Sequence, residues 1–243
     1  MVHLLPLPGA PLFAGSLAEV IDAALSDARA IAGGGCDALA VENFGDRPFF
    51  ATRVPPETIA SMTRVIAEIA AACKLQIGVN VLRNDARSAL AIAAAVGARF
   101  IRVNVHTGAM VTDQGIIEGD AAETLRYRAR LAPDVAIFAD HLVKHATPLG
   151  AQSAKDLRLR GLADAIIITG PETGAPADPE RLAELRDETD APLIVGSGLD
   201  ESNAAQYALA DAAIVGTALK RGGKVDPSRV ERIVRAFKSA GGR

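Results

Sequence analysis

The chain has 243 residues, 49% of them hydrophobic, and a formal net charge of -3. It is long enough to bury a large core, and the absence of a basic stripe or a block of like charge excludes nonspecific nucleic-acid binding and electrostatic membrane anchoring. No apolar run approaches the ~18 residues of a membrane span.

The two cysteines and the N-terminal segment indicate the cellular compartment. Cys36 and Cys73 lie far apart and neither belongs to a Cys-x-x-Cys pair, which favours reduced, buried thiols. The opening MVHLLPLPGAP lacks a basic segment and meets proline early, unlike a signal peptide. We therefore expect a cytoplasmic protein.

Short apolar runs rich in β-branched residues recur eight times along the chain. Most are continuously apolar, which is typical of strands buried on both faces of a parallel sheet. The predicted strands lie at residues 2–7, 37–43, 76–82, 100–105, 135–140, 164–170, 192–198 and 211–217.

Helix signals lie between these runs. Ser16 with Glu19, and Asp120 with Glu123, have the spacing of capping boxes. Asp178 and Asp226 each precede a proline suited to the first helical position. A further helix is predicted to begin at residues 55–57, with apolar residues at helical spacing after it.

Eight strand–helix units in a chain of this length predict an α/β fold, a single-domain (β/α)8 TIM barrel over residues 1–243. A doubly wound open sheet is the alternative, but it would normally have five or six strands. No linker rich in proline, glycine or serine divides the chain.

The last two predicted strands both end in glycine beside a hydroxyl residue. In a TIM barrel the loops after strands seven and eight often hold phosphate, because glycines let backbone N–H groups approach an anion. Relief of crowding where a strand turns is the alternative explanation. The predicted phosphate-binding residues are Gly196, Ser197, Gly198, Gly216 and Thr217.

Two of the other predicted strands end near a residue with a carboxylate side chain. Glu42 and Asp140 are costly to bury unless they are paired or serve a site. We expect them to transfer protons or to hold substrate hydroxyls. A salt bridge with Arg102 or Lys144 is the equally weighted alternative.

Further polar residues near the strand ends are predicted to bind substrate. These residues are His3, Asn80, Asn84, Arg102, Asn104 and Thr169. For Asn84, the alternative interpretation is that Asn84-Asp85 is the N-cap of the following helix.

The segment HLVKH contains His141 and His145 at a spacing of four residues and raises the question of zinc. Lys144 stands where a metalloprotease helix needs its glutamate, so we predict no metal and no cofactor. Lys144 is a third candidate catalytic residue, either as a Schiff-base nucleophile in a desolvated pocket or as the partner of an anion or of Asp140.

Two long segments without a strand pattern, residues 43–54 and 106–120, are expected to be loops. Loops of this length are usually lids or binding loops. Phe49 and Phe50 in the first would suit a lid, a subunit contact or a base-stacking wall, or they could cap the barrel as extra core.

The runs MVHLLPLPGAP, GGGCDALAVENFGDRPF, FIRVNVHTGAMVTDQGIIEG and ADHLVKHATPL, with VGSG and ADAAIVGTALKRGG, resemble the BtpA (SgcQ-like) family over nearly the whole chain. This resemblance implies a phosphate-binding TIM barrel like the ribulose-phosphate-binding barrels. Its founding member is linked to photosystem I accumulation, and other members sit beside sugar-utilisation genes.

Two functions remain open from the sequence. The first is a metal-independent enzyme that acts by acid–base chemistry on a phosphorylated sugar or nucleotide-like molecule, as an isomerase, a lyase or a glycosidic-bond hydrolase. The second is a non-catalytic factor for photosystem I biogenesis or stability. The expected partner is a small phosphorylated ligand, without nucleic acid, and the chain is a candidate for a homo-oligomer.

Overall fold

Eight parallel strands form one sheet in a computed structural model that describes residues 1–241. Each strand pairs with the next one of the eight along the chain, and this confirms all eight predicted strands. The strands are β1 (Val2–His3), β2 (Ala38–Glu42), β3 (Gln76–Asn80), β4 (Phe100–Val103), β7 (Ala136–His141), β9 (Ala165–Ile168), β10 (Leu193–Val195) and β11 (Ala212–Ala213).

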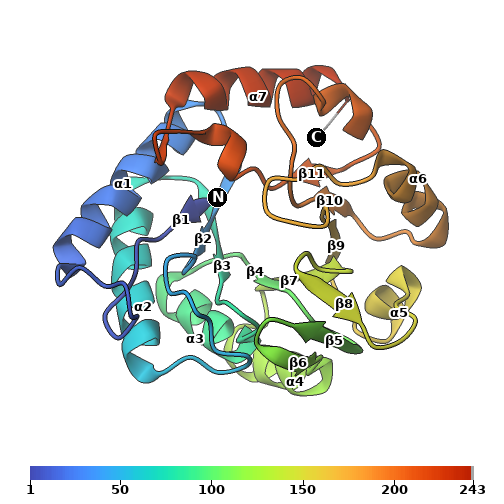
Figure 1. The fold of residues 1–243 in the computed structure, drawn as a ribbon, viewed down its shortest axis with the longest axis horizontal. Coiled ribbons are helices and arrows are strands. Elements are labelled where there is room, and N and C mark those ends of the chain that lie inside the picture. The colour runs from blue at the N-terminus through green and yellow to red at the C-terminus, as the bar shows by residue number, and fades with distance from the viewer. Residues whose placement is uncertain (242–243) are drawn as a thin grey trace.

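The ring of strands closes between its first and last members. The nitrogen of Met1 donates a hydrogen bond of 2.8 Å to the carbonyl oxygen of Val215, just beyond β11. Viewed along the ring, the strands lie inside and the helices surround them (Figure 1). The predicted TIM-barrel architecture is therefore confirmed.

The helices follow the strands and cover their outer faces. They are α1 (Leu17–Gly33), α2 (Pro56–Ala72), α3 (Ala86–Val96), α4 (Ala121–Leu131), α5 (Ala154–Leu159), α6 (Pro179–Glu188) and α7 (Pro227–Ser239). No helix within residues 1–241 is both long enough and apolar enough to cross a bilayer.

One of the eight predicted strand–helix units lacks an α-helix. Only the short 3-10 helix η1 (Ala204–Tyr207) lies between β10 and β11. Asp200 accepts hydrogen bonds from the backbone N–H groups of Ser202 and Asn203, and the Asn203 side chain donates to the Gly198 carbonyl. Such side-chain bonds compete with regular helix in so short a segment.

Three of the predicted N-caps form and one does not. Ser16, Asp178 and Asp226 accept hydrogen bonds from backbone N–H groups at the starts of α1, α6 and α7. Asp120 stands at the N-cap of α4, but its side chain makes no capping bond. The second capping box was therefore wrong.

The predicted loop at residues 106–120 is instead a hairpin of β5 (Ala109–Thr112) and β6 (Gly115–Glu118). A third strand, β8 (Ala146–Pro148), pairs with β5 and gives a small antiparallel sheet beside the barrel (Figure 1). Met110 and Ile117 pack against Val105 and Val143 in a separate small core. This burial, which the sequence segment alone does not reveal, stabilises the hairpin.

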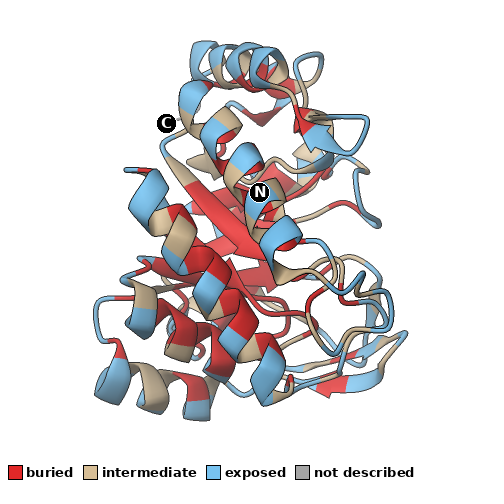
Figure 2. Cartoon of the chain, turned by 90° about the vertical axis from the view of Figure 1, so that its left-hand side faces the viewer, coloured by how far each residue is buried: buried red, intermediate tan, exposed pale blue. Residues whose placement is uncertain are grey.

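The main core lies between the sheet and the helices. In Figure 2 the strands are buried, and the helices are buried on the faces that meet them. Inside the ring, the Phe100 and Phe138 rings stack with centroids 4.6 Å apart. Gly78 gives this pair its space, because a Cβ there would lie 2.0 Å from the Phe100 ring.

Candidate functional site

A cavity of about 210 Å³ opens at the carboxyl ends of the strands, where TIM barrels carry their active sites. Its lining combines polar and charged side chains with the glycine-rich strand ends. The sequence-predicted residues among its lining are His3, Glu42, Arg102, Lys144, Gly196, Ser197, Gly198, Gly216 and Thr217. A larger, mainly apolar cavity of about 280 Å³ lies at the amino ends and contains none of them.

Five ionisable side chains line this cavity, four of them from β1, β2, β4 and the segment after β7, and the fifth, Asp200, from the segment after β10. His3 ends β1, Glu42 ends β2, Arg102 lies in β4 and Lys144 follows β7. His3 and Glu42 are level in the sheet register, and His3 Nε2 lies 3.6 Å from Glu42 Oε2. The barrel thus places two carboxylates, an imidazole and two cations around one space.

His3 is the neutral member of the group. Burial and the nearby Lys220 ammonium lower the pKa of His3 to about 3. Lys220 Nζ lies 3.3 Å from His3 Nδ1, and the Phe44 ring stacks on the imidazole at 4.5 Å. The contact between His3 and Glu42 is therefore a neutral polar contact and not an ion pair.

Asp140 does not line the cavity. Its carboxylate accepts two hydrogen bonds of 3.0 Å from the Arg102 guanidinium and one of 2.7 Å from the Asn104 amide. Burial alone would lower the pKa of Arg102, but Asp140 outweighs this effect and the pKa is raised. The structure thus contains the salt bridge that the sequence left as the alternative for Asp140.

Asn80 extends the same network. Its amide nitrogen donates to the Arg102 carbonyl at 3.2 Å and to Asn104 Oδ1 at 3.3 Å. Neither asparagine lines the cavity. Asn80 bonds the Arg102 backbone and Asn104 bonds Asp140, so direct substrate contact does not follow from their placement.

Lys144 is held in the cavity wall through its backbone. Its carbonyl accepts a 2.7 Å hydrogen bond from Arg83, and its N–H donates to Thr169 Oγ1 at 3.1 Å. Leu142 and His145 on either side have φ values of 53° and 57°, a conformation that costs energy for such residues. Burial, and then the Arg102 charge, lower the pKa of the Lys144 amine. Thr169, predicted to bind substrate, thus supports Lys144 from outside the cavity lining.

The glycines at the ends of β10 and β11 relieve crowding and also leave backbone N–H groups accessible from the cavity. A Cβ at Gly196 would lie 2.3 Å from Ile167, and one at Gly198 would lie 2.2 Å from the Pro176 backbone. Gly198 also has a φ of +68°. Relief of crowding is therefore real at both positions, and the same lack of side chains leaves backbone N–H groups at the cavity wall.

The Ser197 hydroxyl is engaged within the protein. It accepts from the Gly170 N–H at 2.7 Å and donates to the Ala175 carbonyl at 3.0 Å. It thereby fastens the loop after β9, whose residues Thr173 and Gly174 also line the cavity. Sequence reasoning missed this loop because it follows a strand with no charged residue at its end.

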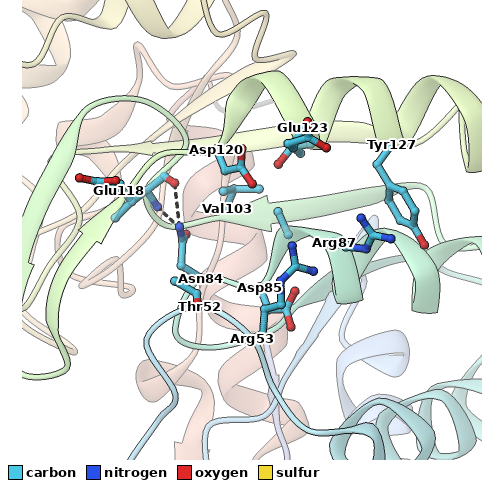
Figure 3. Close-up of a pocket in the computed structure, with 13 residues that line it drawn as sticks. Thr52, Arg53, Asn84, Asp85, Arg87, Val103, Glu118, Asp120, Glu123 and Tyr127 are labelled. Atoms are coloured by element: carbon cyan, nitrogen blue, oxygen red, sulfur yellow. Dashed lines mark hydrogen bonds between the residues drawn. The ribbon is translucent and has the colours of Figure 1, made fainter.

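Asn84 lies outside the site. Its side chain bonds the backbone of Val105 twice, donating at 2.9 Å and accepting at 2.8 Å (dashed in Figure 3). It borders a small polar pocket on the outer side of β4, with Asp120 and Tyr127 on another wall. Asp85 beside it caps α3 by accepting from the Ser88 N–H. Of the pair Asn84-Asp85 that was the alternative N-cap, Asp85 is the residue that caps the helix.

The histidines of HLVKH do not form a helical metal pair. His141 is the last residue of β7 and is buried, whereas His145 is exposed and contacts Thr173. No group of three residues able to ligate a metal is present in the part of the chain that the structure describes.

Comparison with known proteins places these features in a family. The family model described as "BtpA family" matches residues 1–239. A Synechocystis protein named "Photosystem I biogenesis protein BtpA" is 48% identical over 247 residues, covering 98% of this chain and 86% of that protein.

Solved structures with low sequence identity share the fold. Thiamine phosphate pyrophosphorylase from Pyrococcus furiosus superposes with a TM-score of 0.61 at 12% identity, covering 90% of this chain and 91% of that one. Phosphoribosyl anthranilate isomerase from Thermus thermophilus superposes with a TM-score of 0.60 at 14% identity, covering 88% and 94%. These likenesses establish the barrel architecture.

Proposed function

The chain belongs to the BtpA family, and from this premise we propose that it is an enzyme that acts on a small phosphorylated molecule by acid–base chemistry. One observation carries the proposal. A single cavity joins the glycine ends of β10 and β11 to His3, Glu42, Arg102 and Lys144.

The phosphate group is proposed to bind at Gly196, Ser197, Gly198, Gly216 and Thr217. Within residues 1–241, the backbone N–H groups of Ser197 and Gly198 donate to no protein acceptor. Ser197 is buried and Gly198 is half-buried; buried N–H groups normally find a partner, and an anion would supply it. Arg102 and Lys144 face the same space and favour negative charge.

Glu42 is the proposed proton-transfer residue. Its carboxylate is buried and lines the cavity beside the neutral His3. Asp140 is assigned a positioning role, since it holds Arg102 and has no place in the cavity lining. The proposed chemistry uses no metal.

Thermal unfolding in the presence of paired compounds tests this proposal. Ribose 5-phosphate and related sugar phosphates are expected to raise the melting temperature in proportion to the logarithm of their concentration, and the same sugars without phosphate are not. Equal shifts from both members of each pair, or none from either, would refute a phosphate-dependent site.

Glu42→Gln then separates binding from chemistry. We expect this variant to keep the phosphate-dependent shift and to lose turnover of the substrate that the screen identifies, by roughly a hundredfold or more. Full activity of Glu42→Gln would remove Glu42 from the mechanism.

The second candidate is a non-catalytic factor for photosystem I biogenesis. The 48% identity to the Synechocystis protein of that name favours it, and Phe50, which is 57% exposed, offers a partner contact. Complementation of a Synechocystis strain that lacks the relative discriminates between the candidates. If the protein is a non-catalytic factor, the Glu42→Gln variant should still complement this strain. If it is an enzyme, the Glu42→Gln variant should not.

The cytoplasmic location and the homo-oligomer stay predictions from the sequence. We propose both for the enzyme, together with independence from cofactors.

A further inference from the structure

Two lysines lie near the proposed active site, and their surroundings differ. The Lys220 amine is 3.3 Å from His3 Nδ1 and does not belong to the cavity lining. The Lys144 side chain lines the cavity. In the described chain, residues 1–241, its amine has no hydrogen bond and no ion pair.

The position of Lys144 is fixed by three hydrogen bonds to two parts of the fold, the segments after β3 and after β9. Arg83 after β3 binds its carbonyl, Thr169 after β9 accepts from its N–H, and the next residue, His145, donates its N–H to the Pro171 carbonyl. The backbone is thus anchored while the amine stays unpaired in the cavity. A surface lysine that only adds solubility needs no such support.

We infer that the Lys144 amine forms an imine with the carbonyl carbon of a phosphorylated aldehyde or ketone. This inference rests on the proposed function and narrows its substrate class to carbonyl compounds. The glycine ends of β10 and β11 would hold the phosphate across the cavity, and Lys144 would reach the carbonyl group.

The reaction balances with groups already present. The neutral amine adds to the carbonyl carbon, a nitrogen–carbon bond forms, and a proton moves from nitrogen to oxygen. The resulting hydroxyl leaves as water with the proton that the Lys144 ammonium gave to Glu42 on becoming the neutral amine, and the carbon–nitrogen double bond forms as a protonated imine. The Glu42 carboxylate then takes a proton from the neighbouring carbon and returns it, and water releases the amine at the end. No oxidant or reductant is required.

The chemical environment suits an amine nucleophile. An amine must be unprotonated to attack, and desolvated lysines beside another cation meet this need near neutral pH. Lys144 is partly buried, and Arg102 lines the same cavity. Both effects lower its pKa from the ordinary value of a lysine.

Reductive trapping tests the inference on the full chain. The protein is incubated with glyceraldehyde 3-phosphate or dihydroxyacetone phosphate, reduced with borohydride, digested and analysed by mass spectrometry. We expect a dominant adduct on Lys144, which excess inorganic phosphate suppresses and which unphosphorylated glyceraldehyde forms about tenfold less. An adduct mainly on Lys220, or one that glyceraldehyde forms equally well, overturns the inference.

Matched variants complete the test. Lys144→Met should lose the adduct, whereas Lys155→Met, which removes an exposed lysine of α5, should keep it. Calorimetric titration with inorganic phosphate on the same samples separates the two proposals. If phosphate binds and no adduct forms on Lys144, the imine inference fails and the proposed function stands. If phosphate does not bind, the proposed function itself fails.

Discussion

The Asp140–Arg102 pair shows how a polar side chain near the end of a strand can serve structure. Both side chains are almost fully buried, at 0% and 3% exposure, and the guanidinium binds the carboxylate through two nitrogens. Breaking such a pair leaves a buried charge without its partner, which costs more than the pair itself contributes.

Asp140→Asn is therefore expected to lower the free energy of unfolding by about 3 kcal/mol. Urea denaturation measures the change. Glu201→Gln is the matched control, because the ion pair of Glu201 with Arg232 is about half exposed and should contribute less than about 1 kcal/mol. An Asp140→Asn variant as stable as the parent would instead favour a strained catalytic carboxylate.

The sequence could identify the residues of this network but not which of their side chains bond one another. Arg102 of β4 is paired in register with Phe138 of β7. Two residues further along the chain from each lie Asn104 and Asp140, and the Asn104 amide donates a hydrogen bond to the Asp140 carboxylate. Register between strands is set by tertiary packing, so composition and alternation do not reveal it. Glu42 of β2 is paired in register with His3 of β1. Its side chain was expected to face the site and does so in the structure.

At the scale of elements, the helix N-caps offer a direct comparison. Asp178 accepts a 2.9 Å hydrogen bond from the Glu180 N–H at the start of α6, whereas Asp120 makes no side-chain bond at the start of α4. Both residues look equally good in the sequence.

We expect Asp178→Ala to cost about 1 kcal/mol of unfolding free energy, in the range typical of a lost cap. Asp120→Ala should cost only a few tenths, because it removes no capping bond and only a weak interaction with the helix dipole. Thermal denaturation of the two variants side by side checks this. Equal losses would mean that Asp120 caps α4 in solution.

The strands were predictable as elements because their signal is local. Each is an apolar run that needs no knowledge of its neighbours. The hairpin of β5 and β6 was not, because its buried residues Met110 and Ile117 are stabilised by Val143, which lies far along the chain. The short η1 was missed for a related reason, since the eight-fold repeat suggested an α-helix there.

At the scale of the whole molecule, burial of neutral histidines links stability to pH. Burial is the largest cause that lowers the pKa of His3, to about 3, and also the pKa values of His106 and His141. Below the ordinary histidine pKa of about 6.5, the unfolded chain binds protons that the folded chain does not.

The free energy of unfolding should therefore fall as the pH drops from about 7 to about 5.5. Each buried histidine contributes up to about 1.4 kcal/mol per pH unit. Urea denaturation across this range measures the slope, and His106→Gln should make it shallower by the share of one histidine. A stability that stays level over this range would contradict the burial of neutral imidazoles.

The cavity at the carboxyl ends of the barrel is proposed to bind phosphate. Calorimetric titration of inorganic phosphate into the parent chain, Thr217→Gln and Thr217→Glu tests this proposal most directly. Thr217 lines the cavity and is exposed, so both variants are expected to fold. We expect saturable binding to the parent and to Thr217→Gln. Binding to Thr217→Glu should be weaker by about tenfold or more, or 1.4 kcal/mol, because its carboxylate repels the anion. Equal binding by all three proteins, or no binding by the parent, would contradict the proposal.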